Sequence, residues 1–254
     1  MIKFFRKIRY DLMDKNKTGK YLKYAIGEII LVVIGILIAL SINNWSSLNK
    51  EKRILLSHLQ TIKENLKNDE SQLLEMRKFR MKSAEMSTKI IDQYKSGIIE
   101  DQVDFMETFM SIASERKFDS DQSGFQRIKS TSMFDSEELS VIREKILEYN
   151  KVVDATNFME FRQNSQTEKL ESELWSEGFY DEAWSEFRIF SNPKKYNNSK
   201  DKVDFYKLIE KHGEVKGILL RNEFFVIFVI KQYDEIIEKG KELSNEIENY
   251  INKK

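Results

Sequence analysis

The pattern of apolar and polar positions divides the chain into one continuous apolar run and a long remainder with helical periodicity. The run reads YAIGEIILVVIGILIALSI over residues 24–42, and twelve of its residues are Ile, Leu or Val. At about 1.5 Å per residue, a helix of this length spans roughly one bilayer core. Since the sequence holds no second run of this kind, we expect a single transmembrane helix at residues 24–42.

Beyond the run, apolar residues recur at steps of three and four, which is the spacing of an amphipathic helix. Residues 46–96 contain neither Gly nor Pro, and Gly97 is a suitable C-terminal stop. Apolar residues within this stretch form a heptad seam typical of a coiled coil: Leu55, Leu59, Ile62, Leu66, Leu73 and Met76. Asp69 is the polar exception in the seam. We expect this helix to be able to continue from the transmembrane run without a break.

Further helices are expected in the remainder of the chain. They comprise a short helix over 101–113 with Phe105, Phe109 and Ile112 inward, another over 124–130, a long helix capped by Asp135 or Ser136 and ending at Gly178, and a last helix over about 202–250 with a break near Gly213 or Gly217. No alternating strand pattern of useful length occurs. The predicted fold class is therefore all-α, an N-terminal transmembrane helix followed by an antiparallel bundle of long helices.

The segment FFVIFVI, residues 224–230, is apolar on every side of its helix. It is too short to cross a membrane and is flanked by charged residues. We therefore predict that it is fully buried in the centre of the bundle.

Charge around the apolar run predicts its orientation. Residues 1–23 hold eight basic and two acidic residues, and they form a basic segment with the pattern of an amphipathic cytoplasmic helix. The positive-inside rule then keeps the N-terminus in the cytoplasm and exports residues 46–254 as a helical domain, which we expect to be periplasmic. A cleaved signal peptide, with a cleavage site at Ala39-Leu40-Ser41, is the alternative.

Composition narrows the classes of partner. The chain has no cysteine, which excludes disulfides and thiol chemistry. Its net charge is zero, and the exported part carries the acidic excess, so we expect no nucleic-acid partner. The lipid bilayer, a second copy of the chain and an unknown protein partner are the partners we expect.

Candidate catalytic and metal-binding residues are few. His58 and His212 are the two histidines, and the polar helical context of each predicts a surface position. None of the common motifs for metalloproteases, serine hydrolases or nucleotide binding occurs in the sequence. We expect no enzyme, no cofactor and no catalytic or metal site.

One loop resembles part of a calcium site. Asp119, Asp121, Ser123 and Gly124 match positions 1, 3, 5 and 6 of an EF-hand loop, but Ser130 stands where the closing Glu belongs. The alternative is a polar loop in which Ser123 caps the next helix, with Gln126 completing a capping box.

Two features of the apolar run carry functional hypotheses. Gly35 and Ala39 form a small-xxx-small pair, which favours close contact between membrane helices and hence self-association. Glu28 is a carboxylate in the run and a candidate polar membrane site, although its terminal position also lets it reach the interface.

A cluster of aromatic residues lies between residues 175 and 190. Its members are Trp175, Phe179, Tyr180, Trp184, Phe187 and Phe190. Two interpretations remain open, the filling of one end of the bundle and a binding site.

The opening sequence, including KYLKYAIGEIILVVIGILIAL and the following INNW, resembles the start of a family of uncharacterised single-pass membrane proteins from Gram-negative bacteria, catalogued as a domain of unknown function. Weaker similarity continues through FQRIKSTSMF and ELSVIREKILEYNK, and reappears in LLRNEF and ELSNEIENYI. The resemblance implies an inner-membrane protein with a helical periplasmic domain. It implies no activity.

These observations favour a non-enzymatic protein, anchored in the membrane, that presents a helical domain for protein–protein interaction or as an envelope scaffold. The alternative is a periplasmic ligand-sensing bundle that acts through a separate partner. An exposed apolar stripe on a long helix would favour the first, and an apolar pocket with buried polar groups would favour the second.

Overall fold

The computed structural model describes residues 18–99, 102–184 and 203–253, and every regular element in these ranges is a helix. The elements are α2 (Thr18–Ser96), α3 (Gln102–Ala113), α4 (Ser123–Lys129), the 3₁₀ helix η1 (Glu137–Leu139), α5 (Ser140–Ser176), α6 (Phe179–Glu182), α9 (Phe205–Lys211) and α10 (Gly213–Asn252). The all-α fold expected from the periodicity is confirmed. The predicted N-terminal amphipathic segment and the loop around the single proline lie outside the described residues.

The chain forms two compact units, Met1–Ser57 and His58–Lys254, and helix α2 belongs to both. In its 79 residues α2 contains the apolar run and the following amphipathic stretch as one unbroken helix. Among the described residues, α2 is the helix that is long and apolar enough to cross a membrane. Its apolar stretch lies near the N-terminus and is exposed along its length.

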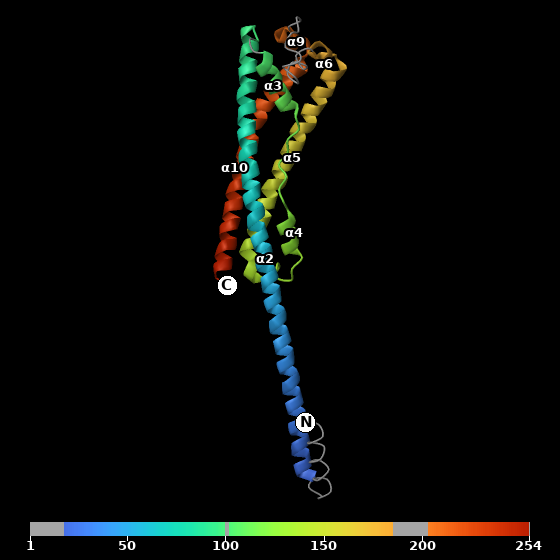
Figure 1. The fold of residues 1–254 in the computed structure, drawn as a ribbon, viewed down its shortest axis with the longest axis vertical. Helices are drawn as coiled ribbons and strands as arrows, with labels where there is room; N and C mark the ends of the chain where they lie inside the picture. The colour runs from blue at the N-terminus through green and yellow to red at the C-terminus, as the bar shows by residue number, and fades with distance from the viewer. Residues whose placement is uncertain (1–17, 100–101, 185–202, 254) are drawn as a thin grey trace, which may run out of the picture. The chain divides into compact units, whose positions relative to one another are not determined.

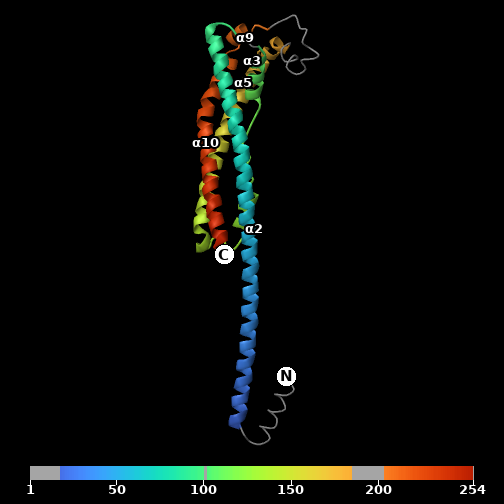
Figure 2. The ribbon, with the colours of Figure 1, turned by 60° about the vertical axis from the view of Figure 1, so that its left-hand side comes forward.

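The second unit is built on three long helices that run side by side (Figures 1 and 2): the C-terminal part of α2, then α5 and α10. Helices α5 and α10 are antiparallel, since Leu170 lies next to Gly217 at one level and Tyr149 next to Gly240 at another. Each buries a stripe at steps of three and four residues, which explains why the periodic pattern predicted them.

The heptad seam of α2 is buried inside this unit. Leu59, Ile62, Leu66, Leu73 and Met76 are all buried, and Asp69 is buried among them. Helix α4 approaches Ile62, and Leu66 lies near the site that a Cβ on Gly240 of α10 would occupy. These seam residues are therefore covered by helices of their own chain.

The short helices α3, α6 and α9 gather at one end of the second unit (Figure 1). Their apolar residues share one core with the ends of the long helices. Its members include Ile90, Ile91, Phe105, Phe109, Leu174, Phe179, Phe205, Leu208, Val215 and Ile218. The inward orientation predicted for Phe105, Phe109 and Ile112 is confirmed.

Glycines mark two helix ends as the sequence predicts. Gly97 follows α2 with a φ of 88°, and Gly178 follows α5 with a φ of 81°. These are left-handed conformations in which a Cβ would be strained, so both positions favour glycine. The expected break in the last helix falls at His212, between α9 and α10.

Candidate functional site

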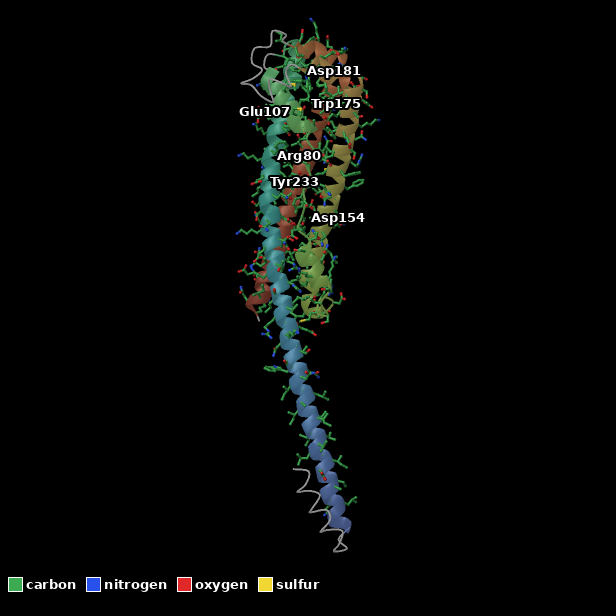
Figure 3. The ribbon with its side chains drawn as sticks, turned by 45° about the vertical axis from the view of Figure 1, so that its right-hand side comes forward. Arg80, Glu107, Asp154, Trp175, Asp181 and Tyr233 are labelled. Carbon is green, nitrogen blue, oxygen red and sulfur yellow. The ribbon has the colours of Figure 1, made fainter. Side chains whose placement is uncertain are left out.

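A buried carboxylate joins three elements in the middle of the second unit. Glu160 of α5 is 0% exposed and accepts hydrogen bonds from the Tyr233 hydroxyl and, at 2.7 Å, from the Phe118 backbone N–H. The Arg80 guanidinium of α2 lies 3.9 Å from it and donates to the Arg116 carbonyl at 2.9 Å. Figure 3 shows Arg80 and Tyr233 at the same level of the bundle. Burial raises the pKa of Glu160, and hydrogen bonds from Tyr233 and Phe118 oppose the rise.

A second buried carboxylate, Asp69, fixes the loop before α4 to helix α2. It accepts from the Tyr149 hydroxyl at 2.6 Å, from the Ser120 hydroxyl at 2.6 Å and from the Asp121 backbone N–H at 3.3 Å. Burial raises the pKa of Asp69, with these hydrogen bonds acting in the opposite direction. The polar exception in the apolar seam is thus the attachment point for a loop about fifty residues further along the chain.

The loop that resembles half an EF-hand uses its polar groups in this attachment. The Asp121 carboxylate accepts from the Ser123 backbone N–H at 2.9 Å, which lowers its pKa, and it also accepts from Asn65 at 2.6 Å. The prediction that Ser123 caps α4 with Gln126 is wrong, because Ser123 is already the first residue of the helix. The cap position is Gln122, and it makes no side-chain cap hydrogen bond.

Gly124 has a packing role rather than the turn role of an EF-hand glycine. A Cβ at this position would lie 2.7 Å from Asn65 Oδ1 and 2.8 Å from Ile62 Cγ1. The absence of a side chain therefore lets α4 approach the backbone of α2. Among the described residues, no group of three His, Asp or Glu side chains could hold a metal ion.

The two histidines differ in their surroundings. His58 is partly exposed, whereas His212 is only 1% exposed, so the predicted surface position of His212 is wrong. His212 Nδ1 lies 3.4 Å from Glu177 Oε2, and its ring meets the edge of Phe179. The sequence around His212 is polar, but the break between α9 and α10 turns this residue into the core.

The prediction that residues 224–230 are fully buried is also wrong. Phe225, Val226 and Val229 face the core, but Phe224 is 65% exposed, and Ile227 and Phe228 are exposed as well. The buried residues of α10 occupy one stripe, and no described element covers the opposite side of this segment. The segment is thus apolar on every side, although one side meets the core and the other is exposed to solvent.

Two exposed residues of this segment, Phe224 and Phe228, line a groove between α5 and α10. The groove has a volume of about 430 Å³. Phe158 and Met159 of α5 and Phe224 and Phe228 of α10 form its walls, and Phe225, which is buried, lies between the helices. The rings of Phe224 and Phe228 contact each other, with centroids 4.9 Å apart. We call this surface the α5–α10 groove.

Two arginines complete the lining of the groove, Arg162 on α5 and Arg221 on α10. The Arg162 guanidinium lies 5.9 Å from the ring centroid of Phe158. The Nε atom of Arg221 is buried without an acceptor in the part of the chain that the structure describes. The α5–α10 groove therefore combines an apolar surface with two cationic groups.

The signal for the groove is present in the buried stripe of α5. Steps of three and four from Tyr149 lead through Val153 and Thr156 to Glu160, and all four residues are buried. This register leaves Phe158 on another face. The first apolar stripe of this helix alone does not reveal Phe158. Extending the buried stripe as far as Glu160 shows that Phe158 lies on another face of the helix.

The aromatic cluster between residues 175 and 190 divides between core and surface. Phe179 and Tyr180 are buried, whereas Trp175 and Trp184 are exposed, and Trp175 stacks on Tyr180 with ring centroids 3.9 Å apart. Phe187 and Phe190 lie outside the described residues. The cluster fills the end of the bundle with part of its members, and its role as a binding site stays a prediction.

The candidate residues of the apolar run lie on the first unit. A Cβ added at Gly35 would meet no atom within 4 Å, and Ala39 is exposed. Glu28 is partly buried. Contact between membrane helices through Gly35 and Ala39, and a polar role of Glu28, stay predictions.

Comparison with known proteins places the chain beside one family model and beside no curated or solved protein. The model of a family of unknown function, DUF6090, matches residues 28–159. This match includes most of the apolar run, the loop attached to Asp69 and the part of α5 that reaches Phe158, and it covers more than half of the chain. The chain therefore belongs to DUF6090, a family of unknown function.

Proposed function

We propose that this protein is a membrane-anchored, non-enzymatic helical protein that binds another protein through the α5–α10 groove. The main support for this proposal is the exposure of Phe158 and Phe224, at 63% and 65%, on two neighbouring helices that line one hollow. Clustered exposed aromatic residues mark interaction sites, because burying them on a partner removes apolar area from water. The exposed stripe is the feature that favours assembly over sensing.

The anchor and its orientation belong to the same proposal. Helix α2 is long and apolar enough to span a bilayer, and the basic residues before it favour a cytoplasmic N-terminus. The resemblance of the opening sequence to Gram-negative membrane proteins supports the inner membrane, with the helical unit in the periplasm. The absence of a recognisable catalytic motif in the sequence supports a non-enzymatic role. The single-pass protein would then act as an envelope scaffold.

Ligand sensing is the second candidate function. A hollow of about 430 Å³ lies within the usual size of small-molecule sites, and Gln163 supplies a buried polar residue in its lining. However, small-molecule sites bury most of the ligand surface, whereas the walls of the α5–α10 groove are largely exposed. The geometry thus favours a partner with an extended surface.

Photo-crosslinking in the cells that make the protein tests the proposal. The crosslinking residue p-benzoylphenylalanine replaces Phe228 of the groove in one variant, and exposed Lys78 of α2 in a control variant. We expect a defined crosslinked product with another protein from position 228 and none from position 78. Crosslinks that are absent at position 228, or equally frequent at both positions, would contradict the proposed function.

A further inference from the structure

The α5–α10 groove carries positive charge that no carboxylate in the described part of the chain pairs with. Arg162 and Arg221 stand on opposite walls, and neither forms an ion pair with any residue that the structure describes. Elsewhere on α5 and α10 basic residues do find carboxylates, as Lys145 does with Glu148 and Glu242. Other basic residues of these helices, such as Lys151 and Lys231, also form no ion pair with the described residues, but the two arginines differ from them by lining an apolar hollow.

The position of the arginines matters because each lies next to apolar surface. The Arg162 guanidinium is 5.9 Å from the centroid of the Phe158 ring, and Arg221 shares the groove lining with Phe224 and Phe225. A partner that covers these rings also removes water from the two guanidinium groups. Such desolvation is costly unless the partner supplies carboxylates, which pair with guanidinium groups through two parallel hydrogen bonds.

The shape of the site limits the partner further. The hollow lies between two antiparallel helices, with apolar residues along both walls. A third helix can lie in such a groove and place apolar residues spaced three and four apart into it. Carboxylates on the flanks of that apolar stripe would meet Arg162 on one wall and Arg221 on the other.

We propose that the α5–α10 groove binds an amphipathic helix of another protein, in which acidic residues flank an apolar stripe. This proposal rests on the proposed function and adds the chemical class of the partner. The phenylalanines supply the affinity and the two arginines supply the charge selectivity.

Binding of two synthetic helical peptides to the full-length protein in nanodiscs tests the proposal. The peptides share one apolar stripe of Leu and Phe, and the flanking positions carry Glu in one peptide and Lys in the other. We expect saturable binding of the Glu peptide and an affinity for the Lys peptide that is weaker by about tenfold or more. Fluorescence anisotropy of labelled peptides measures both affinities.

Variants separate charge selectivity from general hydrophobic adhesion. Replacing both arginines in Arg162→Glu/Arg221→Glu should invert the preference, so that the Lys peptide binds more tightly. The double Arg→Lys variant should retain the preference for the Glu peptide. Phe158→Ser should weaken binding, whereas Phe161→Ser should not, because Phe161 is equally exposed at 63% but does not line the groove.

Each other outcome overturns the proposal. Absence of saturable binding, equal binding of both peptides, or a preference that survives the Arg→Glu replacements would exclude an acidic helix.

Two other occupants of the groove have their own readouts. Sedimentation showing a dimer that Phe158→Ser dissociates and Phe161→Ser does not would assign the groove to a second copy. A bound lipid, detected by native mass spectrometry and lost in Phe158→Ser alone, would assign it to lipid. If crosslinks from position 228 persist while peptide selectivity fails, the proposed function stands without this inference.

Discussion

The two sides of the α5–α10 pair differ in how their polar and apolar groups are used. On the side that faces α2, polar groups are buried and hydrogen-bonded, as for Glu160 with Tyr233 and for Asn222, which donates to Ser87 at 3.0 Å. On the groove side, Phe158 and Phe224 are exposed. Phe158 is two residues from Glu160, and Phe224 two from Asn222, which is about 200° around a helix.

This difference shows which surface the chain completes by itself. On the side that faces α2, even the buried carboxylates, whose removal from water is costly, accept hydrogen bonds from segments far away in the sequence. The groove side leaves large apolar rings and two cationic groups without such neighbours among the described residues. The first side is buried in the fold, and we propose that the second is the binding surface. Substitutions on the side that faces α2 should therefore lower stability. Substitutions on the groove side should weaken binding and leave stability almost unchanged.

The largest effect on stability is expected from Glu160→Ala on the side that faces α2. The variant leaves the buried Arg80 guanidinium without its carboxylate and removes the acceptor of two hydrogen bonds. Breaking such a buried pair costs about 3–5 kcal/mol of unfolding free energy. Urea unfolding of the full chain in detergent, followed by circular dichroism, measures the loss. A change of less than about 1 kcal/mol would show that this contact does not hold the bundle together.

A smaller loss is expected from Gly124→Ala at the contact between α4 and α2. The new Cβ would lie within 3 Å of Ile62 and Asn65, and such overpacking costs about 1–3 kcal/mol. Gly213→Ala is the matched control, since a Cβ there would meet no atom within 4 Å. Equal stability of both variants would mean that α4 does not approach α2 this closely.

A pH-dependent effect is expected from Asp69, whose pKa is raised mainly by burial. The folded chain keeps this proton at pH values where the unfolded carboxyl, with a pKa of about 3.9, has lost it. The contribution of Asp69 is therefore fully present below that pKa and is lost as pH rises through the folded-state value.

The melting temperature of the wild type, relative to that of Asp69→Asn, should accordingly rise as pH falls from 7 towards 4. Differential scanning calorimetry across this range measures the difference. A difference that shrinks on acidification would mean that the pKa of Asp69 is lowered by folding, and would refute the assigned environment.

The smallest effect on stability is expected on the groove side. Phe158→Ser and Phe161→Ser replace exposed rings, so each should change the unfolding free energy by no more than about 0.5 kcal/mol. The same urea titration measures both. Destabilisation of Phe158→Ser by more than about 2 kcal/mol would place this ring in the folding core and remove the contrast between the two sides.

Helical periodicity predicted the parts of this fold that depend on local sequence. The helix ends at Gly97 and Gly178 and the inward positions of Phe105, Phe109 and Ile112 follow from spacing and backbone preference. The burial of the α2 seam follows from the same pattern. All these features are properties of neighbouring residues, so one sequence contains the necessary information.

The predictions that were wrong concern residues whose burial or contacts are decided by segments far away in the sequence. Whether Phe224 is buried depends on what covers that face of α10. Its neighbours in the sequence are apolar, so they do not distinguish a buried face from an exposed one. Gly124 is explained by Asn65 and Ile62, about sixty residues earlier, and the burial of His212 by its contacts with Phe179 and Glu177. The groove could be found in part, because the stripe through Tyr149 and Glu160 leaves Phe158 outward.

Crosslinking from position 228 in two matched variants is the most direct test of the groove side as a binding surface. Phe158→Ser and Phe161→Ser remove equally exposed rings from the same helix, and only Phe158 lines the groove. We expect the crosslinked product to be lost in Phe158→Ser and retained in Phe161→Ser. Retention of the product in both variants, or its loss in both, would show that the groove is not the binding surface.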